Sequence, residues 1–154
     1  MNIAKPIIAS VCILSITLAC LLPRSRAAAA ESSGVYPAVI QNGLSTYTRA
    51  GTAPAFETWR LGGLLENDRQ AGQSADRFEL ITKSLGAYRS DELIQTKEIG
   101  QSSKSVYLAV KFQRGVLYMS FLVFRGDKDW VVQNMEFSTK PDLIMPWLVT
   151  ESGK

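Results

Sequence analysis

The chain has 154 residues, with 17 basic and 14 acidic side chains and no histidine. Lys5, Arg24 and Arg26 precede the first acidic residue, Glu31, so residues 31–154 carry 14 basic and 14 acidic side chains and balance to zero. This balance argues against nucleic-acid binding, which needs a concentrated positive surface. Both cysteines precede residue 31, so that part lacks histidine and cysteine, and we predict neither a metal nor a cofactor.

An export signal is predicted over residues 1–30. Lys5 supplies positive charge, Ile7–Leu22 is mostly apolar, Pro23 interrupts the apolar run, and Ala27–Ala30 offers the small residues that a signal peptidase requires. The apolar run is short for a membrane span, which needs about twenty apolar residues. We therefore expect a cleaved leader, a periplasmic or secreted protein, and no membrane span after cleavage.

Two other fates of this segment fit its residues. Arg24 and Arg26, directly after the apolar run, would also flank an uncleaved amino-terminal anchor. The triplet Leu18-Ala19-Cys20 partly resembles a bacterial lipoprotein processing site. An uncleaved anchor and lipid modification at Cys20 are therefore the alternatives to cleavage.

Residues 31–154 are expected to form a single domain, with a core at about 36–138 and a C-terminal tail at 139–154. Apolar residues recur at helical spacing in 35–50, and two further helices are predicted over 52–61 and 77–85. Glycines directly follow each of these segments, as is common at helix ends. The polar segment 64–73 is predicted to be a surface loop.

Alternating apolar residues predict three antiparallel strands in the second half of the domain, over 106–113, 116–124 and 130–138. With turns at Arg114-Gly115 and Arg125–Asp129, Phe112 pairs with Leu117 and Val123 with Val131, so one apolar face is continuous. A fourth strand is predicted over 93–99, and its register is left open. The expected fold class is α+β, with two or three N-terminal helices packed on a curved antiparallel sheet of three to four strands.

Two local patterns accompany this order of elements. Leu85-Gly86 ends a helix before the sheet, and Gly126, Trp130 and Val132 give the last hairpin a Gly-x-x-x-Trp-x-Val pattern. Over roughly residues 36–138 the chain thus resembles short periplasmic members of the nuclear-transport-factor-2-like superfamily, whose cone-shaped fold is shared with ketosteroid isomerase. The resemblance implies a scaffold and no activity, because no catalytic motif of that superfamily matches here. Cystatin-like inhibitors share a helix on a curved sheet but carry Gln-x-Val-x-Gly, which this chain lacks.

Three side chains are candidates for ligand binding inside this fold. Gln133 is the one polar residue on the predicted apolar sheet face, Trp59 would line a pocket mouth, and Tyr47 has the amphipathic shape of a pocket donor. Each has a structural alternative. Gln133 would then bond a helix end or a buried water, and the two rings would be core packing.

The opposite sheet face is predicted to carry a mixed patch of apolar and polar side chains. Its interface candidates are Tyr118, Leu122, Phe124, Trp130 and Val132. Such a patch usually marks an interaction surface, here for a second copy of the chain or another protein. The alternative is that the tail, with Leu143, Ile144, Met145 and Trp147, folds back and covers it.

Together these features favour an exported, non-catalytic domain that binds an apolar small molecule or a protein partner, a second copy included. No catalytic residue is assigned. The alternative is an isomerase- or lyase-type enzyme that uses a buried carboxylate inside the cone. Glu98 and Glu136 are the acidic residues that the pattern places on strands. A carboxylate that projects into an enclosed pocket would favour the enzyme.

Overall fold

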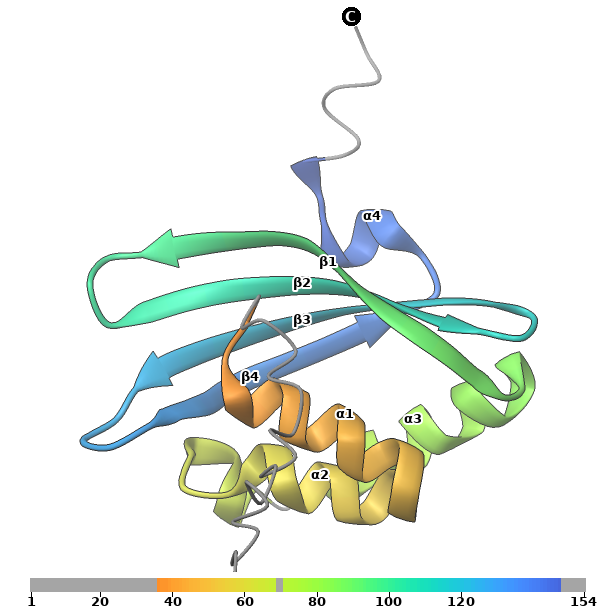
Figure 1. Cartoon of the computed structure of the whole chain (residues 1–154), viewed down its shortest axis with the longest axis horizontal. Coiled ribbons are helices and arrows are strands. Elements are labelled where there is room, and N and C mark those ends of the chain that lie inside the picture. Colours follow the sequence, from red (N-terminus) through yellow and green to blue (C-terminus); the bar gives the residue numbers. More distant parts are fainter. Residues whose placement is uncertain (1–35, 69–70, 148–154) are drawn as a thin grey trace, which may run out of the picture. The chain divides into compact units, whose positions relative to one another are not determined.

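Helices precede strands along the chain in the computed structural model, which describes residues 36–68 and 71–147. These residues belong to one compact unit, Ser32–Lys154. The predicted leader at 1–30, with Cys20 and the alternative anchor, lies outside the described residues. Within them the elements are α1 (Ala38–Ala50), α2 (Thr52–Arg60), the 3-10 helix η1 (Leu64–Asn67), α3 (Ala71–Leu85), β1 (Tyr88–Ile99), β2 (Ser103–Phe112), β3 (Gly115–Arg125), β4 (Trp130–Ser138) and α4 (Pro141–Ile144) (Figure 1).

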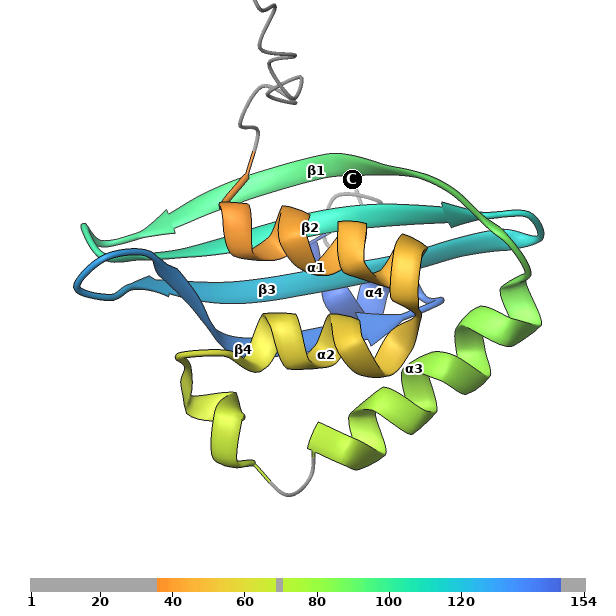
Figure 2. The ribbon, with the colours of Figure 1, turned by 60° about the horizontal axis from the view of Figure 1, so that its bottom comes forward.

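The predicted α+β class, with helices before an antiparallel sheet, is confirmed. The four strands follow one another in the order β1-β2-β3-β4, and every neighbouring pair is antiparallel. α1, α2 and α3 lie on one face of the sheet and α4 on the other (Figure 1, Figure 2). β1 begins at Tyr88 rather than at the predicted residue 93, because two register shifts interrupt the alternation that would have revealed its first half.

The core between helices and sheet is filled by aromatic rings. The ring centroid of Phe78 lies 5.4 Å from that of Phe56 and 5.2 Å from that of Phe137, both edge-to-face. Trp59 contacts Phe121 of β3 with a centroid distance of 5.5 Å. Beside these rings, the strands contribute fully buried aliphatic side chains, namely Val106, Leu108, Val110, Leu117, Met119, Val123 and Val132.

The hairpin between β2 and β3 keeps the predicted faces but not the predicted pairs. Phe112 pairs with Gly115 and Val110 with Leu117, so the turn is formed by Gln113 and Arg114. The end of α3 holds this turn, since the amide of Arg114 donates to the carbonyl of Leu85 at 2.9 Å. A shift of two residues leaves each side chain on its own face, so the error in register does not change the predicted core.

The predicted register of β3 with β4 is wrong in a way that does move side chains. Val123 pairs with Val132 and Phe121 with Met135, which leaves Gln133 as an extra residue in a bulge opposite Leu122 and Val123. Val132 is therefore fully buried on the helix side, whereas Val131 pairs with Phe124 on the outer face. The close approach of Gly63, on which a Cβ would lie 2.3 Å from the carbonyl oxygen of Val132, fits this local bend.

The C-terminal tail covers part of the outer sheet face. Ile144 and Met145 are 6% and 1% exposed, and Trp147 packs edge-to-face on Tyr107 of β2 with a centroid distance of 4.7 Å. Figure 1 shows α4 on the side of the sheet opposite α1. The tail therefore folds back onto this face, but Leu143 and Phe124 stay 62% and 38% exposed, so it covers the face only in part.

Candidate functional site

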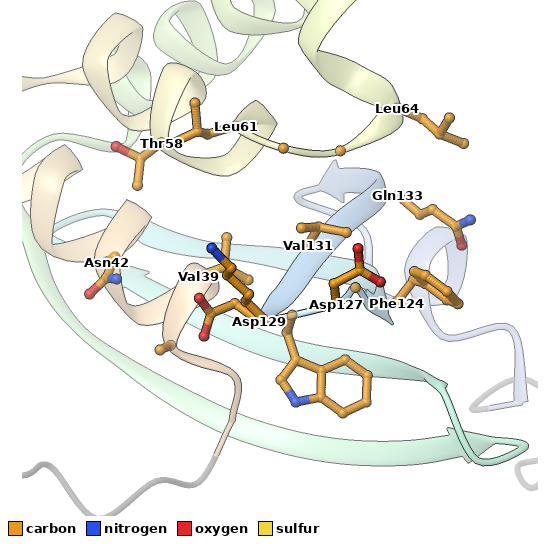
Figure 3. A pocket seen from close by; sticks show the side chains of 16 residues that line it. Val39, Asn42, Thr58, Leu61, Leu64, Phe124, Asp127, Asp129, Val131 and Gln133 are labelled. Atoms are coloured by element: carbon orange, nitrogen blue, oxygen red, sulfur yellow. The ribbon is translucent and has the colours of Figure 1, made fainter.

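A groove of about 890 Å³ lies at one end of the sheet. Its walls come from the start of α1, the segment that follows α2, and the hairpin between β3 and β4 (Figure 3). Apolar side chains line most of it, among them Val39, Leu61, Leu64, Phe124, Trp130 and Val131. Polar side chains share the lining, namely Asn42, Thr58, Asp127, Lys128, Asp129 and Gln133.

The segment after α2 is fixed in place by its own polar contacts. Gly62 has a φ of +72°, in the left-handed region that glycine adopts without strain, and it turns the chain away from α2. The guanidinium of Arg60 donates from Nε to the carbonyl of Leu65 at 2.7 Å, and Glu66 accepts the amide of Gly62 at 3.1 Å. These bonds close the segment into a compact loop beside the groove.

This loop presents two large apolar side chains to solvent. Leu61 and Leu64 are 68% and 75% exposed, and both line the groove. Neither belongs to the hydrophobic core or to the residues packed against it. Exposed apolar residues that gather around a groove are typical of a binding surface, in contrast to single ones scattered over a protein.

The hairpin that forms the opposite wall is also well defined. The amide of Gly126 donates to the carbonyl of Asp129 at 2.9 Å and closes the turn. The ammonium of Lys104 lies 4.2 Å from the ring centroid of Trp130 and 3.5 Å from Glu98. These contacts hold Trp130 on the helix side of the sheet, where it pairs with Arg125, and not on the outer face where it was predicted.

The three predicted ligand-binding residues do not come together. Gln133 lines the groove, at the bulge in β4. Trp59 does not line it and is fully buried, with its indole nitrogen donating to the carbonyl of Ile40 at 3.3 Å. Tyr47 packs edge-to-face on Phe78 at 5.4 Å and borders a second groove of about 580 Å³ at the C-terminal end of α1.

Most of the groove could not be predicted from the sequence, because much of two of its walls is formed by the loop after α2 and the turn between β3 and β4. Residues 64–73 were expected to be an undistinguished surface loop, and Asp127 and Asp129 lay within a predicted turn. One signal was available: Leu61, Leu64 and Leu65 surround Gly62-Gly63 in a segment otherwise expected to be polar. These apolar residues lie next to a glycine turn and follow neither helical nor strand periodicity. The sequence therefore assigns them no position in the hydrophobic core.

The predicted interface residues divide between the two faces of the sheet. Tyr118, Leu122 and Phe124 lie on the outer face, as predicted, and Phe124 is 38% exposed. Val132 and Trp130 lie on the helix side because of the bulge in β4. The outer apolar surface is therefore smaller than predicted.

Glu98 on β1 lies on the helix side of the sheet opposite Lys104, with which it forms an ion pair at 3.5 Å. The other carboxylate on that side of β1 is the one of Asp91. It pairs with the buried Val110 and accepts hydrogen bonds from the hydroxyl groups of Tyr36 and Tyr88, the latter at 2.5 Å. Partial burial, followed by the hydrogen bond to Asp91, raises the pKa of both phenols above the usual tyrosine value. The sequence did not indicate this cluster, because the first half of β1 was not predicted as a strand.

The described part of the chain contains no group of three or more acidic, histidine or cysteine side chains placed to hold a metal ion. None of the helices within the described ranges is both long and apolar enough to cross a membrane. Comparisons with models of protein families, with curated proteins and with solved structures found no match.

Proposed function

We propose that this domain is a non-catalytic binding module that takes an apolar small molecule into the groove between α1, the loop after α2 and the β3–β4 hairpin. The single observation that carries the proposal is the exposure of Leu61 and Leu64, which line the groove without packing on the core. Covering these side chains with an apolar ligand would remove them from water, at about 25 cal/mol for each Å² buried. The groove volume of about 890 Å³ lies within the range of small-molecule sites.

As scaffold for this module we propose a cone of the nuclear-transport-factor-2-like type, produced for export. Support comes from the order of elements, with α1, α2 and α3 on one face of a four-stranded antiparallel sheet. Under this proposal the wide part of the cone is filled by the rings of Phe56, Trp59 and Phe78. A ligand would then bind at the end of the sheet, beside the groove loops.

The alternative of a carboxylate-dependent isomerase or lyase has one observation in its favour, the position of Asp91 on the helix side. Against it, two phenol groups already bond the Asp91 carboxylate, and Asp91 lines neither of the two grooves described above. A general base needs access to a substrate proton. Binding without catalysis is therefore the better-supported function.

A neutral apolar fluorophore such as N-phenylnaphthylamine tests the proposal. We expect saturable binding, with fluorescence that rises as the probe leaves water, and about tenfold weaker binding in the double variant Leu61→Ser, Leu64→Ser. Leu80→Ser is the matched control, because Leu80 on α3 is 72% exposed but does not line the groove. Equal binding by all three proteins, or no saturable binding, would refute the proposed site.

A further inference from the structure

We infer that the groove selects ligands with a positive charge beside the apolar part, that is, cationic amphiphiles. This inference rests on the proposed function and adds the chemical class of the ligand. It is carried by the combination of an apolar lining with two carboxylates, Asp127 and Asp129, which the turn between β3 and β4 presents to the groove. Figure 3 shows Asp127 near Val131 and Gln133, and Asp129 on the side of Val39.

Neither carboxylate is neutralised by another side chain of the described residues. The ion pairs formed there involve other acids, namely Glu57, Glu79, Glu92 and Glu98, and both aspartates are exposed. An exposed carboxylate without an ion-pair partner costs little free energy, because water solvates it. It still attracts a cation when an apolar contact holds that cation close to it. A bound apolar chain would supply that contact.

The positive side chains near the groove do not cancel this charge. Lys104 is already shared between Glu98 and the ring of Trp130. Arg60 is committed to Glu57 and to the carbonyl groups of Leu65 and Glu66. Lys128 lines the groove between the two aspartates, so the side chains of the turn that line the groove carry two negative charges and one positive charge, or −1. Arg125, at the base of the turn opposite Trp130, does not line the groove.

The arrangement suits an organic cation better than a metal ion. Two carboxylates on an exposed turn are too few for Ca²⁺, which takes six to eight oxygen ligands. An ammonium group needs only proximity to negative charge, and it also interacts favourably with an aromatic face such as that of the half-exposed Phe124. Apolar walls, an aromatic ring and net negative charge together match a cation attached to a hydrocarbon chain.

Three probes with the same hydrocarbon chain test the inference: octyltrimethylammonium, octanol and octanoate, each below its micellar concentration. By isothermal titration calorimetry we expect the cation to bind about fivefold to tenfold more tightly than octanol, and octanoate to bind more weakly than octanol. High salt should reduce the difference between the three, because the aspartates are exposed.

Variants of the turn between β3 and β4 test whether its charged residues cause the preference for the cation. Asp127→Asn and Asp129→Asn should each weaken binding of the cation about threefold and leave octanol binding unchanged, whereas Lys128→Gln should strengthen binding of the cation. Asp142→Asn, on α4 and outside the groove, is the control and should change nothing.

The possible failures are distinguishable. If octanol binds but the three probes do not differ, the charge selection is refuted and the proposed function stands. If the cation is preferred equally by wild type and by both aspartate variants, the turn is not its cause and the inference is overturned. If none of the probes binds, the proposed function itself has failed.

Discussion

Gly43 lies in the middle of α1, a position where alanine normally stabilises a helix by about 1 kcal/mol relative to glycine. Here a Cβ would lie 1.8 Å from the indole nitrogen of Trp59, which is fully buried. We therefore predict that Gly43→Ala lowers the free energy of unfolding by about 2 kcal/mol, because overpacking a rigid ring outweighs the gain in helix propensity. Urea denaturation measures the change.

Gly72 on α3 provides the control for this prediction. Gly72 lies in the first turn of α3, and nothing lies within 4 Å of the position that its Cβ would occupy. Gly72→Ala should raise the free energy of unfolding by about 0.5–1 kcal/mol. If both substitutions stabilise the protein, the contact between Gly43 and Trp59 does not constrain α1.

Tyr36 and Tyr88 should make stability fall in alkaline solution. Their pKa values are raised by partial burial and by the hydrogen bonds to Asp91, so the folded protein keeps these protons above about pH 10, where unfolded tyrosine loses them. The unfolded state then binds fewer protons than the folded state, and the free energy of unfolding decreases as pH rises. Below about pH 9 both states keep the protons and this contribution is constant.

Denaturation curves at about pH 8 and about pH 11 test this prediction. The double variant Tyr36→Phe, Tyr88→Phe should be less stable than wild type at the lower pH, because it lacks both hydrogen bonds to Asp91. It should also lose less stability between the two conditions. An equal loss in both proteins would show that these phenols do not carry the pH dependence.

Strand β3 carries a phenylalanine on each face of the sheet. Phe121 is fully buried against Trp59, whereas Phe124 is 38% exposed on the outer face. Phe121→Ala should cost about 3–5 kcal/mol, as expected for removing a buried ring. Phe124→Ala should cost about 1 kcal/mol, because much of its ring is already in water. A loss below about 1 kcal/mol for Phe121→Ala would mean that the face assignment is wrong.

The faces of β2 and β3 could be predicted from the sequence because strand alternation has a period of two. A register error of two residues, as at the turn of Gln113 and Arg114, leaves every side chain on its face. The bulge at Gln133 could not be predicted, because strand alternation does not show where an extra residue is inserted. In the fold, the backbone of Val132 lies against Gly63, far away in the sequence. One extra residue in the bulge was enough to move Val132 from the predicted patch into the core.

The candidate site was less predictable than the fold because much of it is formed by loops. Loops have no periodicity, so their residues reveal no common face in the sequence. The groove depends on Arg60 and Glu66 closing the loop after α2, and on a hairpin whose turn follows β3. Of the predicted ligand-binding residues, Gln133 alone lines the groove, and it does so through the bulge rather than through the predicted alternation.

We propose that the predicted leader is cleaved from the protein before Glu31. This cleavage would leave the described fold complete. Tyr36, whose hydroxyl bonds Asp91, and the groove residue Val39 both lie after this position. Cleavage would also change the charge: the full chain carries +3, and its three basic residues before Glu31 would leave with the leader. The mature protein should therefore be close to neutral.

Native mass spectrometry of the protein purified from the cells that produce it tests this proposal. We expect a chain that begins at or near Glu31, without a bound metal, and isoelectric focusing should show a band near neutrality rather than a basic one. Recovery of a chain that still contains the apolar segment Ile7–Leu22 would favour the uncleaved anchor. A chain that begins at Cys20 with added lipid mass would identify a lipoprotein, and stoichiometric zinc would contradict the metal-free prediction drawn from the absence of histidine and cysteine after residue 30.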